Sequence, residues 1–180
     1  LLQLAEKGLI GLDDFAGDYL PELDLIPLLG PDGNMLPPGK RIRVRHLLTH
    51  TSGFCYSFMH PRLARFVRPE DYAFSDLPRL HEAGEKWTYG TSTDWVGQLV
   101  ERVSGLNLEA YFRKFITGPL EMNSTWFNVP EELHPMVVSF GVRPVPGRGE
   151  IRETPRRITR ESDNYSGGAG LHSSLSDYLI

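Results

Sequence analysis

The chain has 180 residues, of which 40% are hydrophobic and 23% are charged, and its formal net charge at pH 7 is −4. This composition predicts a globular domain with a sizeable core and argues against a nucleic-acid partner, since no strongly basic surface is available. The longest apolar runs are only a few residues, so no segment is expected to span a membrane. The single cysteine, Cys55, excludes an internal disulfide framework and leaves either a reducing compartment, with the cytoplasm favoured, or a buried thiol.

The two ends of the chain carry helical patterns that look incomplete. The first residues, LLQLAEKGLIG, contain leucines in helical phase but no initial methionine and no capping residue, and they predict a helix over residues 1–9 that closes at Gly11. The last residues, SSLSDYLI, hold a serine suited to N-capping and leave room for only about two turns. Both ends therefore favour a chain that is part of a larger domain.

The segment from residue 21 to residue 40, LPELDLIPLLGPDGNMLPPG, predicts an extended loop with a turn at Pro31-Asp32-Gly33. The segment VRHLLTH that follows predicts a short helix ending at Ser52-Gly53. This helix places His46 and His50 at positions i and i+4. No glutamate follows His46 and no third ligand is evident, so we interpret both histidines as structural and expect no metal.

Residues 87–105, WTYGTSTDWVGQLVERVSG, set a tyrosine directly in front of a helical pattern. Apolar residues recur at i, i+3, i+4 and i+7, which predicts a helix with one buried face. Ser92 or Thr93 can cap its first turn, and Gly105 suits a left-handed end. Tyr89 then lies just before the helix, where its hydroxyl can face a cleft or, in the alternative that the pattern leaves open, meet solvent.

A further amphipathic helix is predicted from Leu108 to Ile116, capped by Asn107 and stopped by Gly118-Pro119. The segments MVVSFGVRPV and GEIRE beyond it are interpreted as short strands. No Gly-x-Ser-x-Gly occurs, which argues against an α/β-hydrolase elbow. No phosphate-binding loop occurs either, and no cofactor is expected.

Five segments in a fixed order resemble the serine β-lactamase-related superfamily, which includes class C β-lactamases, D-alanyl-D-alanine carboxypeptidases and family VIII carboxylesterases. They are LLQLAEKGLIGLDDFAGDYLPEL, IRVRHLLTHTSGF, WTYGTSTDWVGQLVERVSG, GPLEMNSTWF and GGAGLHSSLSDYL. The resemblance implies an α+β fold, of which this chain is the mostly helical portion of the β-lactamase/transpeptidase-like fold with the sheet largely missing. It also implies that residues 1–180 are part of a single domain, truncated at both ends.

The resemblance also implies three site residues. In the family, a Tyr-x-Asn element supplies a tyrosine that exchanges a proton with a nucleophilic serine, and the corresponding element here is Tyr89-Gly90-Thr91, so Tyr89 is implied to be catalytic. Thr91 replaces the asparagine that helps lactamases to bind the substrate amide, which argues against efficient β-lactam hydrolysis. Tyr56 matches a rim position where esterases of the family carry an aromatic residue, so it is implied to contact substrate, with packing against its own loop as the alternative.

The family's nucleophile lies in a Ser-x-x-Lys element, which is absent from this sequence, as is the downstream Lys-Thr-Gly or His-x-Gly element. The resemblance thus implies a fragment of a serine hydrolase that acts through an acyl-enzyme, as a carboxylesterase or acyltransferase, on a small-molecule ester or amide. Two alternatives stay open. One is a β-lactamase or D-alanyl-D-alanine carboxypeptidase, and the other is a non-enzymatic binding module on the same scaffold.

Overall fold

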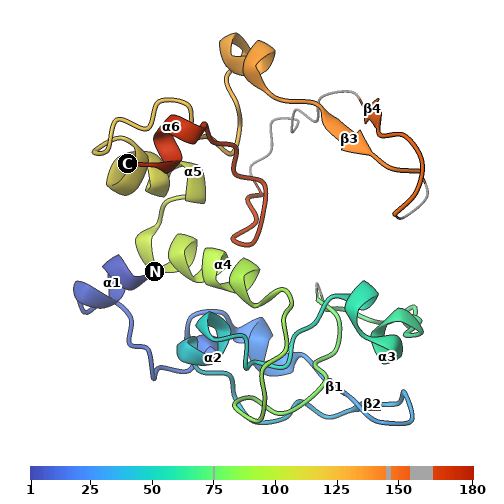
Figure 1. The fold of residues 1–180 in the computed structure, drawn as a ribbon. Helices are drawn as coiled ribbons and strands as arrows, with labels where there is room; N and C mark the ends of the chain where they lie inside the picture. The colour runs from blue at the N-terminus through green and yellow to red at the C-terminus, as the bar shows by residue number, and fades with distance from the viewer. Residues whose placement is uncertain (75, 145–146, 155–163) are drawn as a thin grey trace. The chain divides into compact units, whose positions relative to one another are not determined.

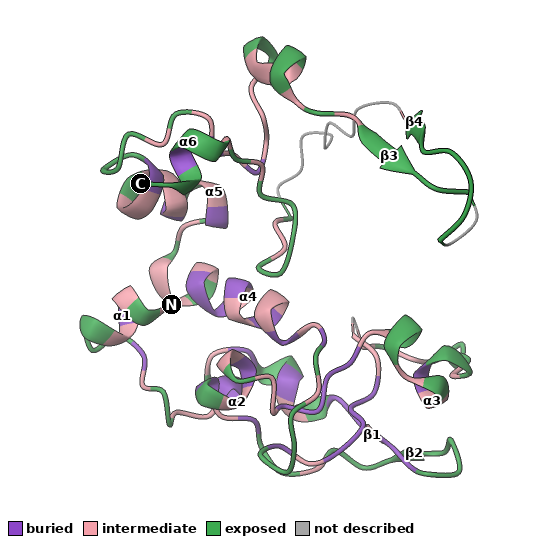
Figure 2. Cartoon of the chain, in the orientation of Figure 1, coloured by how far each residue is buried: buried purple, intermediate pink, exposed green. Residues whose placement is uncertain are grey.

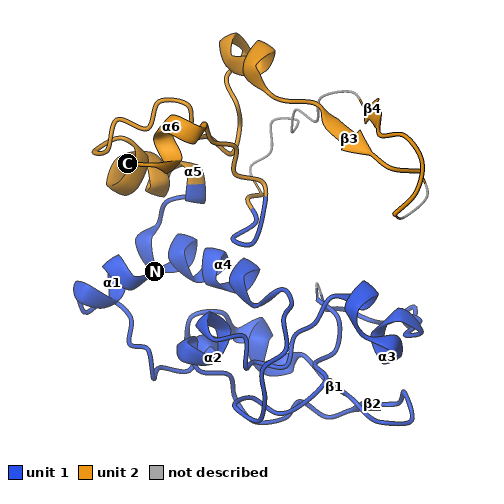
Figure 3. Cartoon of the chain, viewed as in Figure 1, with its two compact units in different colours: residues 1–108, 166–169 blue, residues 109–165, 170–180 orange. Residues whose placement is uncertain are grey.

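The computed structural model describes residues 1–74, 76–144, 147–154 and 164–180 (Figure 1). The chain divides into two compact units (Figure 3). Unit 1 comprises residues 1–108 and 166–169, and unit 2 comprises residues 109–165 and 170–180. Apart from one helix of 13 residues, the described helices are short, and long loops join them. Two small sheets are present, so the expectation of a mostly helical chain is only partly confirmed.

Unit 1 begins with helix α1 (Leu2–Glu6), which is shorter than the helix predicted over residues 1–9. It ends early because Gly8 adopts a left-handed backbone, with φ +67°, ahead of the predicted stop at Gly11. Two 3₁₀ helices follow, η1 (Ala16–Asp18) and η2 (Pro21–Leu25).

The proline- and glycine-rich segment contains a small antiparallel sheet that the sequence pattern does not indicate. Its strands are β1 (Leu28–Leu29) and β2 (Met35–Leu36), with Leu28 opposite Leu36. The turn lies where it is predicted, since the Gly33 N–H donates to the Gly30 carbonyl at 3.1 Å and Gly33 has φ +86°. Strands of two residues are too short to produce a hydrophobic alternation.

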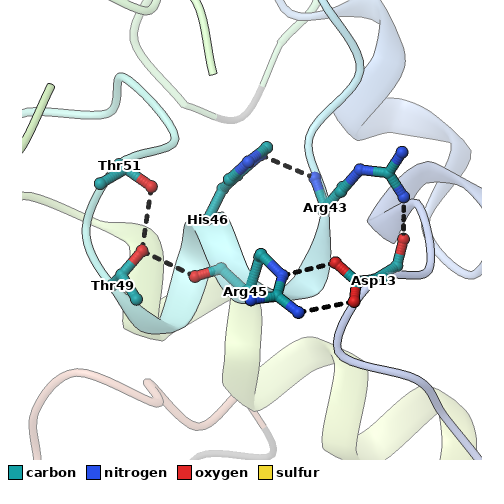
Figure 4. A network of polar contacts seen from close by, with 6 residues as sticks. All are labelled: Asp13, Arg43, Arg45, His46, Thr49 and Thr51. Atoms are coloured by element: carbon teal, nitrogen blue, oxygen red, sulfur yellow. Dashed lines mark hydrogen bonds and ion pairs between the residues drawn. The ribbon is translucent and has the colours of Figure 1, made fainter. Parts of the chain in front are cut away.

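Helix α2 (Val44–Leu48) is held at its start by a polar network, shown in Figure 4. The Arg43 N–H donates to His46 Nδ1 at 3.1 Å, and the Arg45 guanidinium donates to both carboxylate oxygens of Asp13, at 2.5 and 2.6 Å. At the other end of α2, Thr49 Oγ1 donates to the Arg45 carbonyl at 2.8 Å. The network therefore fixes both ends of a helix that has fewer than two turns.

The chain leaves α2 earlier than predicted. The helix ends at Leu48 and not at Ser52-Gly53, because His50 adopts a left-handed backbone with φ +53°. A 3₁₀ helix, η3 (Ser57–Met59), and helix α3 (Pro61–Ala64) follow.

Helix α4 (Ser92–Ser104) is the long helix predicted from residues 87–105. Gly105 ends it in the left-handed conformation, with φ +69°, as predicted. The predicted cap is wrong, because Thr91 is the N-cap residue in place of Ser92 or Thr93. Ser92 cannot serve, since its hydroxyl is buried against the Ser52 hydroxyl at 2.8 Å.

The core of unit 1 forms where α2 packs against α4, and many of its buried residues are purple in Figure 2. Leu47 of α2 and Trp95 and Leu99 of α4 are at most 2% exposed, and the Phe54 ring stacks on the Trp95 ring with centroids 6.0 Å apart. Burying one large apolar side chain stabilises a fold by about 1.5–3 kcal/mol. This packing fixes the start of α4, and so the backbone that precedes it.

Helix α5 (Leu108–Phe112) leads into unit 2 and continues as the π-helix η4 (Arg113–Thr117). The helix predicted from Leu108 to Ile116 is therefore present, with a wider final turn. A 3₁₀ helix, η5 (Glu131–Met136), precedes the two short predicted strands, which form an antiparallel pair, β3 (Phe140–Val142) and β4 (Arg152–Thr154). Helix α6 (Leu175–Tyr178) is capped by Ser174, whose hydroxyl accepts the Asp177 N–H at 3.2 Å. Within the described ranges, no helix combines the length and apolarity that a membrane crossing requires.

Candidate active site

Tyr89 lies in unit 1 on the loop that leads into α4, and the residue before it ties this loop to two histidines. The Thr88 N–H donates to the His50 carbonyl at 2.8 Å. The Thr88 hydroxyl and His81 Nε2 form a hydrogen bond of 2.8 Å, and His81 is buried. The backbone on the N-terminal side of Tyr89 is therefore anchored at two points.

Gly90 fixes the other side of Tyr89 through close backbone packing. A Cβ atom at this position would lie 2.5 Å from Cys55 Cα and 2.6 Å from the Phe54 carbonyl oxygen, and both of these are backbone atoms. A residue with a side chain would therefore push the two segments apart. The glycine in Tyr89-Gly90-Thr91 thus brings this loop against the segment that carries Tyr56.

Three aromatic rings surround the ring of Tyr89. The centroid distances are 4.8 Å to His50, 5.8 Å to Tyr56 and 6.2 Å to Trp87. Tyr89 is still 43% exposed, and its hydroxyl makes no hydrogen bond within the described residues. The ring is thus held by packing, while the hydroxyl has no hydrogen-bond partner among the described residues.

Tyr56 lies beside Tyr89 and is only partly exposed. Its ring also stacks on the ring of Phe58, with centroids 5.3 Å apart. Burial raises the pKa of the Tyr56 phenol, and the negative charge of Asp94 raises it further. Tyr56 therefore remains protonated at neutral pH and can donate a hydrogen bond.

Thr91 is near Tyr89 in sequence, but its hydroxyl is turned to a carboxylate that the sequence pattern does not indicate. Thr91 Oγ1 donates to Asp76 Oδ2 at 2.5 Å, and the buried indole of Trp95 donates to the same oxygen at 2.9 Å. This engagement also explains why the Thr91 side chain does not cap α4. Asp76 is fifteen residues away along the chain, so no local spacing links it to the site.

The two histidines interpreted as structural have separate environments. His46 Nδ1 accepts the Arg43 N–H, and burial lowers the pKa of His46, with further lowering by the charges of Arg43 and Arg45. Burial also lowers the pKa of His50, whose ring packs on Tyr89. In the part of the chain that the structure describes, no group of three or more His, Cys, Asp or Glu side chains is arranged to hold a metal ion.

Comparison with known proteins gives a consistent result. The family model described as Beta-lactamase matches residues 1–180. Among curated proteins, the chain is similar to monacolin J acid methylbutanoyltransferase from Aspergillus terreus, with 38% identity over 72% of this chain and 35% of the relative. It is also similar to lovastatin esterase from Penicillium rubens, with 34% identity over 70% of this chain and 35% of the relative.

Among solved structures, a mutant of simvastatin synthase from Aspergillus terreus matches with a TM-score of 0.84 and 33% identity. The match covers 99% of this chain and 46% of that chain. The chain therefore spans less than half the length of these relatives.

Proposed function

The chain belongs to the beta-lactamase family, and on that premise we propose that it is part of a serine acyl-enzyme hydrolase or acyltransferase that acts on small-molecule esters. The observation that carries the proposal is the setting of Tyr89, whose ring contacts three other aromatic rings while the residue stays 43% exposed and its hydroxyl has no hydrogen-bond partner among the described residues. Similar proteins bear the names of a methylbutanoyltransferase and an esterase, which supports acyl transfer to an alcohol or to water.

In the proposed reaction, a serine oxygen attacks the carbonyl carbon of the ester while the phenolate form of Tyr89 accepts the serine proton and becomes the neutral phenol. The tetrahedral intermediate then expels the alcohol, which takes the proton from Tyr89, and the acyl group remains bonded to serine. Water or a second alcohol next attacks the acyl-enzyme and gives its proton to Tyr89, which returns it to the released serine oxygen. Attack by water makes the protein an esterase, and attack by an alcohol makes it an acyltransferase.

We place the nucleophilic serine outside these 180 residues, because the sequence contains no Ser-x-x-Lys and the similar proteins are more than twice as long as the stretches matched. In this proposal, residues 1–180 are part of a single domain, and the main sheet of the family's fold comes largely from sequence beyond them. The Ser-x-x-Lys element and the Lys-Thr-Gly or His-x-Gly element, which this sequence lacks, would then lie outside these 180 residues.

Tyr56 and Thr91 are assigned to substrate binding in the same proposal. Tyr56 lies beside Tyr89 and carries a protonated hydroxyl that can donate to a polar group of the substrate. Thr91 lies two residues after Tyr89 and presents its methyl group and oxygen lone pairs, since its hydrogen is engaged by Asp76.

A serine-directed fluorophosphonate probe tests the proposal on two proteins, the 180-residue chain and the full-length protein that contains it. We expect one serine to be labelled in the full-length protein, within a Ser-x-x-Lys element, and no specific labelling of the short chain. Specific labelling of the short chain would place the nucleophile among its own serines. A full-length protein without labelling and without ester hydrolysis would favour a binding module.

A further inference from the structure

The Asp76 carboxylate accepts three hydrogen bonds. Thr91 Oγ1 and Trp95 Nε1 both donate to Oδ2, at 2.5 and 2.9 Å, and the Leu77 N–H donates to Oδ1 at 2.7 Å. Thr91 is the N-cap residue of α4 and Trp95 lies in its first turn. The carboxylate therefore joins the start of α4 to the segment around residue 76.

The bond from Thr91 decides what this residue can offer to a substrate. A threonine hydroxyl has one hydrogen to donate and two lone pairs that accept. A hydrogen bond to a carboxylate is charge-assisted and roughly twice as strong as one between neutral groups. While Thr91 donates to Asp76, it cannot donate to a substrate carbonyl.

Trp95 keeps the carboxylate in the position that engages Thr91. Its side chain is 2% exposed, its ring stacks on Phe54 in the core, and its N–H is directed at the same Asp76 oxygen. The acceptor of the Thr91 hydrogen bond is thus fixed from the core side, so reorienting the Thr91 hydroxyl would break a short charge-assisted bond.

We propose that Asp76 is a positioning residue that sets substrate preference, because it withdraws the Thr91 hydroxyl as a donor to amide groups in the acyl chain of the substrate. This inference rests on the proposed function. An acyl chain with an amide would place its carbonyl oxygen beside an acceptor and leave it unpaired, which is unfavourable when the group is buried. An acyl chain that contains only hydrocarbon has no polar group to leave unpaired. The site therefore favours esters of unfunctionalised acyl groups.

Two esters with one leaving group and matched chain length test the preference in the full-length protein: p-nitrophenyl N-acetylglycinate, which carries an amide, and p-nitrophenyl pentanoate, which does not. The readout is the amide ratio, defined as kcat/KM for the acetylglycinate divided by kcat/KM for the pentanoate. Asp76→Ala frees the Thr91 hydroxyl, and we expect the amide ratio to rise about tenfold, as one gained hydrogen bond allows. The double variant Asp76→Ala with Thr91→Val has no hydroxyl to free, so its ratio should return to the wild-type value.

Two matched controls separate this role from a loss of structure. Asp76→Asn can keep an oxygen at the Oδ2 position for both Thr91 and Trp95, and its amide ratio should stay within about threefold of wild type. Trp95→Phe removes the indole donor that helps to fix the carboxylate, but Thr91 can still donate to Asp76, so this variant should reduce stability and raise the amide ratio less than Asp76→Ala does.

The results that would overturn the inference are specific. If Asp76→Ala lowers kcat/KM for both esters equally, Asp76 only supports the fold. If Thr91→Val alone lowers the amide ratio about tenfold, the hydroxyl already serves the substrate, and this variant decides the question even where Asp76→Ala does not fold. A wild-type protein that neither hydrolyses the esters nor reacts with the fluorophosphonate would overturn the proposed function, and this inference with it.

Discussion

The ring of Tyr89 lies against the ring of His50, with centroids 4.8 Å apart and planes inclined by 45°. His50 makes this contact from a left-handed backbone that few non-glycine residues adopt. Its carbonyl oxygen also accepts the Thr88 N–H. One residue thus positions the Tyr89 loop through both its backbone and its side chain.

We therefore expect His50→Asn to lower the turnover of the full-length protein by roughly ten- to a hundredfold, the range that a small displacement of a catalytic group produces. Asparagine tolerates the left-handed backbone, so the hydrogen bond from Thr88 is kept while the ring contact is lost. The free energy of unfolding should fall by only about 1 kcal/mol. Steady-state kinetics and urea unfolding measure the two effects, and wild-type turnover in this variant would show that the ring contact is dispensable.

Tyr89→Phe tests the catalytic role directly. The substitution keeps the ring and its three aromatic contacts but removes the hydroxyl that carries the proton. Turnover of ester by the full-length protein should fall by about two to four orders of magnitude, with little change in the melting temperature. Tyr178→Phe, at a tyrosine that is 81% exposed in unit 2, serves as the control. Near-normal turnover in Tyr89→Phe would end the assignment.

The sequence predicts those features that depend on neighbours along the chain. The left-handed end of α4 at Gly105, the turn at Gly33 and the cap at Ser174 each follow from one residue type at one local position. The early end of α2 does not follow from a local residue type, because it depends on a histidine, His50, in an unusual backbone conformation.

The contacts that position the residues of the candidate site are harder to predict from the sequence. Thr91 becomes the N-cap residue without capping through its side chain, and its partner Asp76 is linked to it only by the fold. The contact between His50 and Tyr89 joins residues thirty-nine positions apart, and neither spacing nor periodicity indicates it. The family resemblance locates Tyr89, whereas the groups that position it become visible only in three dimensions.

In the proposed site, Thr91 gives a second prediction about substrate class. Because its hydroxyl donates to Asp76, Thr91 is not available as a donor to the amide group of a β-lactam. Full-length protein should therefore hydrolyse short-chain p-nitrophenyl esters with a kcat/KM at least about a hundredfold above that for penicillins and cephalosporins. Comparable efficiency on both classes, measured spectrophotometrically under one set of conditions, would favour a β-lactamase.

His46 gives a prediction for the dependence of stability on pH. Its pKa is lowered in the folded protein, so below the unfolded value of about 6.5 the unfolded chain binds a proton that the folded chain does not. The contribution of His46 is therefore complete above about pH 7 and is lost as the pH falls toward the lowered value. His50 and His60, whose pKa values are also lowered, act in the same direction.

His46→Gln removes one of these titrations and keeps an acceptor for the Arg43 N–H, since glutamine at this helix position can reach back as histidine does. The decrease in melting temperature from about pH 7 to about pH 5 should be smaller in the variant than in wild type. Asp13 and Asp177 affect stability only at more acidic pH, because their pKa values are lowered below the usual value for a carboxylate. An unchanged slope between pH 7 and pH 5 would show that His46 does not contribute to it.

Gly90→Ala tests whether the close approach of two backbone segments is needed to place Tyr89. The added Cβ would meet Cys55 Cα at 2.5 Å and the Phe54 carbonyl oxygen at 2.6 Å, and neither atom can move without shifting its segment. We expect the free energy of unfolding to fall by about 1–3 kcal/mol, as for overpacked sites, and turnover to fall at least about tenfold, because Tyr89 is the adjacent residue. Gly39→Ala is the matched control, since the three atoms nearest to its Cβ all belong to the carboxylate end of Glu82, a flexible side chain that can rotate away at the cost of the hydrogen bond that it accepts from the Lys40 N–H. Urea unfolding and ester turnover of both full-length variants make the comparison. If Gly90→Ala behaves like Gly39→Ala in both measurements, the two segments can separate freely. The position of Tyr89 must then be fixed by its ring contacts and by the hydrogen bonds of Thr88 to His50 and His81.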